Sequence, residues 1–251
     1  MDDGKKTDAE RLLALMRSHR TIRKFTDAPV PDGLVRECVE AAQCASTSSN
    51  VQGYAIVRLR DAKTRARLVE MTGGQPQVAQ AGAFFVLCAD QRRHELAAED
   101  EKRAYEGNLE TFLVDVIDTA LFAQNLALAF EAHGLGICFI GGLRNELPEV
   151  DRMLALPHGV LPLFGMCVGE PDDEPMARPR LPVEAVLLEE RYPRDAEMRE
   201  QMDRYDAETR EYYLTRAGKS LTWRGGVARK HEQARRPHLY RFFESKGVRW
   251  R

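Results

Sequence analysis

Apolar residues recur at intervals of three or four along several stretches of the chain, which is the spacing of one face of an α-helix. The first stretch covers residues 8–17. A second helix is predicted to begin at Pro31 and Asp32, residue types that commonly occupy the start of a helix, and a third is predicted over residues 61–71. The apolar stripes of the first two helices are Leu12, Leu13 and Met16, and then Val35, Cys38, Val39 and Ala42.

The longest helical pattern covers residues 108–133 and ends at Gly134, a residue type that favours the position just past a helix end. This pattern is apolar over much of the helix circumference, so we expect a helix of the core or of a dimer interface. Its apolar residues are Leu109, Phe112, Leu113, Val116, Ala120, Ala123, Leu126, Ala127 and Phe130.

Four shorter stretches have the composition of β-strands: residues 54–60, 83–90, 135–140 and 160–169. Residues 83–90 form a continuous apolar run, which is typical of a strand buried on both faces in the middle of a sheet.

The remaining segments are rich in charge or proline. Residues 91–107 carry many charges and no clear apolar stripe, which predicts an exposed, mobile insertion that is helical in part. The prolines of residues 171–182 predict an extended loop. Charged helices follow, with a break at Gly225–Gly226 and a last short helix over residues 239–245.

We find no internal repeat and no linker to a second independent domain. The chain is therefore predicted to be one domain over residues 1–251, with a basic C-terminal extension from about residue 191 to residue 251.

Composition fits an ordinary globular protein that needs no disulfide or metal to fold. The chain has 251 residues, 43% of them hydrophobic, and a net charge of −2. The amino-terminal hexapeptide lacks the apolar segment of a signal peptide, and apolar runs such as residues 83–89 are too short to span a bilayer.

Five cysteines, an odd number without a C-x-x-C pair, all lie in apolar surroundings. They predict buried free thiols in the cytoplasm.

Charge is distributed unevenly along the chain. From Arg191 onward there are 16 basic and 9 acidic residues, against 21 basic and 30 acidic residues before it. Such a tail is compatible with an anionic small ligand, an acidic partner surface or nucleic acid. The nucleic-acid hypothesis is the distant alternative, because the acidic body would oppose it. It would use a basic and aromatic set: Arg229, Lys230, Arg235, Arg236, Tyr240, Arg241, Phe242 and Phe243.

Common catalytic motifs are absent from the sequence. There is no G-x-S-x-G, H-E-x-x-H, P-loop or G-x-G-x-x-G pattern. The six histidines show no metal-ligand spacing, so no metal is expected, and His133 is expected to complement a helix dipole. The reaction, if there is one, is therefore expected to belong to a bound cofactor.

Cationic and glycine-rich loops remain as candidate binding elements. The heptad of residues 19–25 contains Arg20, Arg23 and Lys24, which are either a solvated helix end or the partners of an anion. Arg178 and Arg180 lie between prolines. Guanidinium groups bind phosphate through charge-assisted hydrogen bonds of about 1.5–3 kcal/mol each. The hydroxyl cluster of residues 45–52 is either a plain loop or a donor-rich rim for a polar ligand.

These elements belong to an ordered set of seven segments: HRTIRKFT (19–26), STSS (46–49) with Gln52, TGGQ (72–75), IGGLRN (140–145), LPLFG (161–165), RPRLP (178–182) and YYLTR (212–216). No single segment is specific, but the ordered set resembles the flavin-dependent nitroreductase family. The resemblance is to the branch of the major oxygen-insensitive NADPH nitroreductases and NADPH-flavin oxidoreductases. It implies an α+β fold, in which helices flank a central mixed, mostly antiparallel sheet, and an interlocked homodimer with FMN at the interface.

The resemblance also implies roles for individual residues. Arg20, Thr21, Arg178 and Arg180 would hold the FMN phosphate. Arg23 would lie at the N1/O2 edge of the ring and Gln75 at the pyrimidine rim. Residues 46–49 would reach across from the other subunit, and residues 140–143 would pass N5. The complete set of implied FMN contacts is His19, Arg20, Thr21, Ile22, Arg23, Ser46, Thr47, Ser48, Ser49, Gln52, Gln75, Ile140, Gly141, Gly142, Leu143, Arg178 and Arg180.

The implied activity is NADPH oxidation with two-electron, ping-pong hydride transfer to nitroaromatics, quinones or related acceptors. The alternative within the family is a flavin reductase that supplies free reduced FMN. Arg216, with Lys219 as the nearest second cation, would bind the NADPH 2′-phosphate, and Arg236 and Asn50 would flank the substrate. Arg178 stands where the family pattern leads us to expect lysine, and Asn50 where it leads us to expect an aromatic residue.

Overall fold

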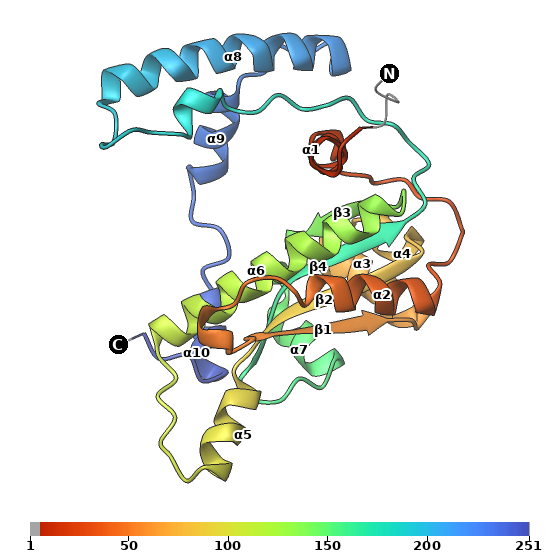
Figure 1. Cartoon of the computed structure of the whole chain (residues 1–251), viewed down its shortest axis with the longest axis vertical. Helices are drawn as coiled ribbons and strands as arrows, with labels where there is room; N and C mark the ends of the chain where they lie inside the picture. The colour runs from red at the N-terminus through yellow and green to blue at the C-terminus, as the bar shows by residue number, and fades with distance from the viewer. Residues whose placement is uncertain (1–5, 251) are drawn as a thin grey trace. The chain divides into compact units, whose positions relative to one another are not determined.

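The computed structural model describes residues 6–250, and Figure 1 shows its elements. From the sequence, we predict that the first six residues do not begin a signal peptide. Residues 1–5 of this hexapeptide lie outside the described part. The chain divides into two compact units. The first contains residues up to 175 together with 238–250, and the second contains residues 176–237. Each unit is described by itself.

A four-stranded sheet forms the centre of the first unit. Its strands are β1 (Tyr54–Leu59), β2 (Ala83–Asp90), β3 (Gly136–Ile140) and β4 (Val160–Gly169), in the order β1-β2-β4-β3. All three strand pairs are antiparallel, and a parallel component appears only as an isolated bridge between Thr21 and Ile137 in the described chain. Every residue of β2 is buried, as its continuous apolar run predicts.

Successive residues of the strands face two different cores. Phe85 and Leu87 of β2 pack under α2 (Asp32–Ala42) and α6 (Leu109–Ala132). Phe84 and Val86 face the opposite core, which contains side chains from α3 (Ala62–Met71), α4 (Gln77–Gln80) and α7 (Leu147–Met153). Helices therefore cover both faces of the sheet, so its central strands are apolar on both sides.

Helix α6 carries the largest apolar surface. One face, which includes Phe122, Leu126 and Phe130, is buried against the sheet. On another face, an apolar stripe repeats every four residues and is exposed: Leu109, Leu113, Ile117 and Leu121. By length and composition this helix could cross a membrane, unlike the shorter apolar run of residues 83–89 noted in the sequence. That finding is weak evidence for a membrane span, because a core helix meets the same criterion.

The other elements of the first unit are α1 (Asp8–Ser18), the short 3₁₀ helices η1 (Ser48–Asn50) and η2 (Gly141–Asn145), α5 (Arg92–Asp100) and α10 (Leu239–Ser245). Phe242 and Phe243 of α10 are buried in a third apolar cluster with Leu147 and Leu161. Buried in this position, they cannot stack on nucleic-acid bases. The nucleic-acid hypothesis therefore loses two of its three aromatic residues.

The second unit consists of an extended stretch, η3 (Val183–Ala185), α8 (Asp195–Ala217) and α9 (Trp223–His231). The predicted break at Gly225–Gly226 is wrong, because both glycines lie inside α9. The Thr222 side chain caps this helix, and Arg224 fastens it to Asp206 of α8. A second correction concerns the cysteines: four are buried as predicted, but Cys44 is exposed.

Candidate functional site

The cationic heptad lies along the edge strand β3 as an extended segment. The Ile22 backbone N–H donates to the Ile137 carbonyl at 3.0 Å, and Thr21 forms a bridge with Ile137. Ile22 and Phe25 are buried, whereas Arg23 and Lys24 are exposed. The two apolar side chains thus fix the segment to the sheet and leave its cations outside. The side chain of Ile22 belongs to the core, so only its backbone is available to a ligand.

The arginines of this segment differ from its histidine in their polar contacts. The Arg20 guanidinium donates to the carbonyl oxygens of His19, at 2.8 Å, and of Arg17, at 3.2 Å. His19 does face a carboxylate, with Nδ1 2.5 Å from Oε1 of Glu131. Within residues 6–250, neither Arg20 nor Arg23 forms an ion pair. Guanidinium groups bind anions through charge-assisted hydrogen bonds, so the half-buried Arg20 and the exposed Arg23 are candidate partners of an anion.

Two glycine turns meet beside this segment. Gly73 and Gly74 have φ values of +84° and +76°, a backbone region that glycine adopts without strain. A Cβ on Gly142 would overlap the Gln75 side chain and the Thr72 carbonyl oxygen, so only glycine fits where η2 touches the turn of residues 72–75. The Gln75 amide nitrogen donates to Thr72 O at 2.9 Å, and its oxygen accepts from Gln77 at 3.2 Å.

Cys138 of β3 connects the cations to this turn. Burial raises the pKa of the Cys138 thiol, and the nearby Arg23 charge and Gln77 side chain partly oppose that shift. Arg23 and Gln77 therefore approach the same buried thiol. The structure thus brings the 19–25 segment, the end of β3 and the 72–77 turn together. Ile140 and Leu143 are completely buried, so neither presents its side chain to a ligand in this structure.

The hydroxyl cluster lies at the opposite corner of the sheet. Residues 46–52 precede β1, whose first residue Tyr54 pairs with Ala89, while the cations lie along β3 at the other edge. Three strand-to-strand steps separate these edges, a distance of about 14 Å before any offset along the strands is added. The side chains of Ser46, Ser48, Ser49, Asn50 and Gln52 are exposed, and Thr47 is half-buried. One copy of the unit does not bring this cluster to Arg20.

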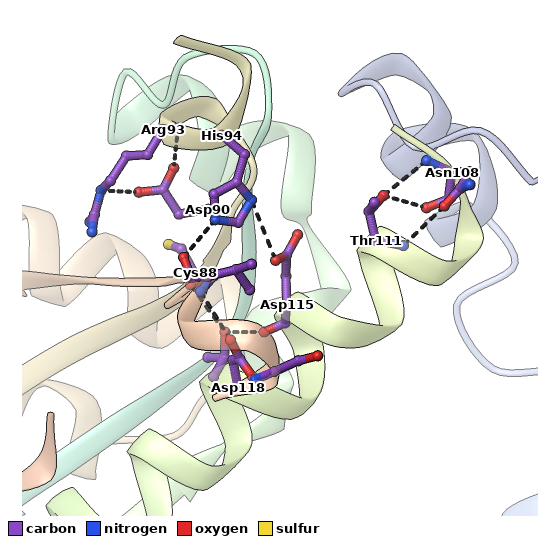
Figure 2. A network of polar contacts seen from close by, with 12 residues as sticks. Cys88, Asp90, Arg93, His94, Asn108, Thr111, Asp115 and Asp118 are labelled. Carbon is purple, nitrogen blue, oxygen red and sulfur yellow. Dashed lines mark hydrogen bonds and ion pairs between the residues drawn. The ribbon is translucent and has the colours of Figure 1, made fainter. Parts of the chain in front are cut away.

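Buried acids that the sequence reasoning missed support the cluster. Asp115 and Asp118 of α6 are each 1% exposed, and Figure 2 shows them beside His94 of α5. Burial raises the pKa of Asp115 to about 6. A signal was present in the sequence: two aspartates one helical turn apart interrupt a strongly apolar helix, and a buried carboxylate requires hydrogen-bond donors.

The second unit carries the other predicted cations. Tyr205 of α8 donates its hydroxyl to the Pro179 carbonyl at 2.8 Å, which fixes the residue between the exposed Arg178 and Arg180. Arg216 donates to the Tyr212 hydroxyl at 2.9 Å and lies over the Tyr212 ring. The 11 residues from position 205 to position 216 span roughly 16 Å of helix. Two separate groups of cations therefore lie along α8.

Two further predicted residues complete this unit. Lys219 is exposed just after Gly218, which ends α8 with a φ of +63°. Arg236 is half-buried with a φ of +56°, and burial, aided by the adjacent Arg235, lowers its pKa. Because these cations belong to the second unit, their convergence with Arg20 and Arg23 on one ligand stays a prediction.

Comparison with known proteins decides the family. Residues 16–170 match the nitroreductase family, and residues 178–251 match the C-terminal domain of that family. The chain belongs to the nitroreductase family. This confirms the resemblance carried by the seven sequence segments.

Several members of the nitroreductase family are similar over almost the whole chain. The oxygen-insensitive NADPH nitroreductase of Salmonella typhimurium is 42% identical, over 94% of this chain and 97% of its own. The FMN reductase (NADPH) of Bacillus subtilis is 40% identical, over 92% and 95%. The solved structure of B. megaterium NfrA1 superposes with a TM-score of 0.93 at 41% identity, over 95% of this chain and 99% of that chain. These matches confirm the predicted α+β nitroreductase fold.

Proposed function

We propose that this protein is an FMN-dependent NADPH oxidoreductase that reduces nitroaromatics, quinones or related acceptors. The observation that carries the proposal is a pair of arginines beside β3, Arg20 and Arg23, that form no ion pair within residues 6–250. They lie near the η2 position where only a glycine, Gly142, fits. A phosphate and a flat polar ring are the groups that such an arrangement suits. Relatives named for NADPH, nitro compounds and FMN support the same function.

The residues present fit FMN. Arg20 is held by backbone carbonyls, which directs its remaining N–H donors outward, and we assign it to the phosphate with Thr21, Arg178 and Arg180. Arg23 would place a positive charge beside the ring, where it stabilises negative charge. Gln75 would present its amide to the ring edge, and the glycines of η2 let the backbone approach closely. Bound FMN would accept two electrons from NADPH and pass both to the acceptor.

We propose a homodimer in which the hydroxyl cluster of one copy serves the site of the other. The cluster and Arg20 lie at opposite edges of the sheet, and the cluster is exposed and so accessible to a second copy. The exposed stripe of α6 gives such a pair an apolar contact surface: Leu109, Leu113, Ile117 and Leu121. Burying this stripe against its equivalent would remove apolar side chains from water. The unpaired cysteines fit a cytoplasmic location for this dimer.

For NADPH, we assign Arg216 to the 2′-phosphate with Lys219 as a second cation. The Tyr212 ring and hydroxyl hold Arg216 at the end of α8, so its charge is partly oriented before NADPH binds. The tail from residue 216 onward contains 11 basic and 2 acidic residues, which adds a favourable field for an anionic dinucleotide. Arg236 and Asn50 are proposed to border the acceptor.

The second candidate is a flavin reductase that releases reduced FMN. It is favoured by relatives named FMN reductase (NADPH) and NADPH-flavin oxidoreductase, which are 40% and 37% identical to this chain. A comparison of acceptors separates the two candidates: free FMN would be the best oxidant of a flavin reductase, whereas a nitroaromatic or quinone would be the best oxidant of the enzyme proposed first.

Reconstitution tests the proposal directly. The purified apoprotein should bind one FMN per chain, turn yellow and lose its colour under anaerobic NADPH, and NADH should act more slowly. Oxidation by a nitroaromatic or a quinone should restore the colour. A protein that takes up no FMN, or a yellow protein that NADPH does not bleach, would overturn the proposal.

A further inference from the structure

The loop that leads into β1 has a backbone that its own residues do not favour. Ser49, Asn50 and Gln52 have φ values of +48°, +60° and +52°, the left-handed region that side chains other than glycine avoid. Within the loop, Val51 N–H donates to Ser48 O at 2.9 Å, and the Gln52 amide donates to Asn50 O at 3.3 Å. The loop is largely exposed, so contacts with other elements must maintain this conformation.

Asp118, in the middle of α6, supplies two of these contacts. Its Oδ1 accepts the backbone N–H of Ser48, and its Oδ2 accepts the backbone N–H of Gly53, both at 3.1 Å. One carboxylate thus joins the first and last residues of the 48–53 loop. Because Asp118 is 1% exposed, these charge-assisted bonds are shielded from competing water.

His94 holds the middle of the same loop from α5. Its Nε2 lies 2.8 Å from the Val51 carbonyl oxygen, and a carbonyl can only accept, so Nε2 carries a proton and donates. The other ring nitrogen, Nδ1, lies 3.8 Å from Oδ1 of Asp115. Figure 2 shows His94 directed from α5 toward the acids of α6. The charged 91–107 insertion thereby contributes a contact to the loop.

Asp115 fills the space behind the loop. A Cβ on Gly53 would overlap the Asp115 carboxylate, so the loop can pass α6 this closely only with glycine at that position. Asp115, Asp118 and His94 therefore surround one short stretch of backbone on its buried side, while the hydroxyls of Ser48 and Ser49 remain on the exposed side.

We propose that Asp118 and His94 are positioning residues that hold the 48–53 loop in the left-handed conformation through which it contacts FMN in the site shared with the partner subunit. The inference rests on the proposed function, because it needs FMN as the ligand of the shared site. Neither residue touches FMN itself. Each acts by populating the one loop conformation that can bind.

The size of the effect follows from populations. When only a fraction of the protein has the competent loop, the apparent Kd for FMN rises by the reciprocal of that fraction. In Asp118→Asn, a single amide oxygen would face two backbone donors, and the NH₂ group would oppose one of them. Loss of one charge-assisted bond corresponds to a roughly 10- to 100-fold weaker apparent affinity.

The test uses the full-length apoprotein and measures FMN binding by quenching of flavin fluorescence, with the thermal midpoint recorded for each variant. Asp118→Asn should weaken binding roughly 10- to 100-fold, and His94→Ala about 5- to 10-fold. His94→Gln should restore affinity to within about twofold of the wild type, because its amide nitrogen can donate to Val51 O as Nε2 does. A merely structural loss would not be rescued in this way.

Asn108→Ala is the matched control. Asn108 caps the same helix α6, with its side chain accepting from Thr111 N–H at 3.0 Å, and lies far along the helix from the loop. This variant should lower the thermal midpoint and leave the Kd for FMN unchanged.

Each result decides one question. Wild-type affinity in Asp118→Asn, or the same weakening in Asn108→Ala, would overturn the positioning role. If Asp118→Asn does not fold, the His94→Ala and His94→Gln pair decides, and equal affinities in these two variants would overturn the role. If the wild type binds no FMN at all, the proposed function fails rather than the account of the loop.

Discussion

Two corners of the sheet are built in opposite ways. At the β3 corner, the backbone is held by ordinary pairing with Ile137, and the guanidinium groups of Arg20 and Arg23 form no ion pair with any residue from 6 to 250. At the β1 corner, the charged group Asp118 is fully engaged by backbone N–H groups, and the strain lies in the backbone of Ser49, Asn50 and Gln52. At the first corner the charged groups stay accessible to a ligand. At the second corner the charged group fixes the backbone of a loop.

The largest expected effect is on the packing of the β1 corner. In Gly53→Ala, the new Cβ would overlap the Asp115 carboxylate and approach the α6 backbone. Such overpacking should destabilise the protein by about 3 kcal/mol, a fall of roughly 6–12 °C in thermal midpoint. Calorimetry of the apoprotein measures it. Gly33→Ala, at an exposed helical site with nothing near the new Cβ, should instead stabilise slightly, and equal midpoints for the two variants would refute the packing argument.

The next effect is on ligand binding at the β3 corner. Arg20→Ala removes a guanidinium assigned to the phosphate and should raise the Kd for FMN by roughly 10- to 100-fold, with little change in the stability of the apoprotein. Titration of the apoprotein with FMN measures the change. Arg17→Ala, an exposed neighbour at the end of α1, is the control and should bind FMN as the wild type does. Equal losses in both variants would point to general charge rather than to a phosphate contact.

A pH effect is expected from Asp115. Burial raises its pKa from 3.8 to about 6, so the folded protein holds a proton that the unfolded chain has released. Ionised Asp115 therefore lowers stability as the pH rises from about 4 to about 6, and the loss persists above that range. Asp115→Asn should stabilise the protein by about 1–3 kcal/mol at pH 8, and the gain should vanish near pH 4.

Thermal midpoints at the two pH values measure this difference. Asp27→Asn, at an exposed position, serves as the control and should change the midpoint little at either pH. A gain in Asp115→Asn that is equal at pH 8 and pH 4 would show that the burial of charge is not its cause.

The smallest effect is expected in the second unit. Arg216→Ala removes the proposed partner of the 2′-phosphate and should raise KM for NADPH by about fivefold to tenfold, with KM for NADH unchanged. Steady-state kinetics with both nucleotides measures the split, and Arg210→Ala on the same helix is the control. Parallel rises in both KM values would remove Arg216 from the phosphate contact.

Local sequence patterns predicted most of the elements. The apolar runs predicted β2 and β4. The apolar pattern of residues 108–133 predicted α6, and Gly134 marked its end, where it has a φ of +77°. The break at Gly225–Gly226 was wrong because a local cap and a tertiary contact outweigh glycine's low helix propensity. Thr222 caps α9, and Arg224 pairs with Asp206 of α8. Propensity alone contains no information on such contacts.

The candidate site was predictable where it depends on short segments and not where it depends on distant partners. The heptad and the two glycine turns carry their chemistry in adjacent residues, so the sequence indicated them. The contact of His94 with Val51 and those of Asp118 with Ser48 and Gly53 join residues that are far apart in the chain. In the sequence, Asp115 and Asp118 were marked as unusual only because they lie one helical turn apart in an otherwise apolar helix. Whether a second copy supplies the loop depends on assembly, which no local pattern encodes.

The most direct test of the shared site is FMN binding to a hybrid dimer, purified with two different tags, in which one chain carries Arg20→Ala and the other Asp118→Asn. If each site combines the cations of one chain with the loop of the other, the hybrid has one intact site and one doubly altered site. The account then predicts one FMN per dimer bound with wild-type affinity. A hybrid with no wild-type site, in which both sites are weakened equally, would show that each chain builds its site alone and would contradict the account.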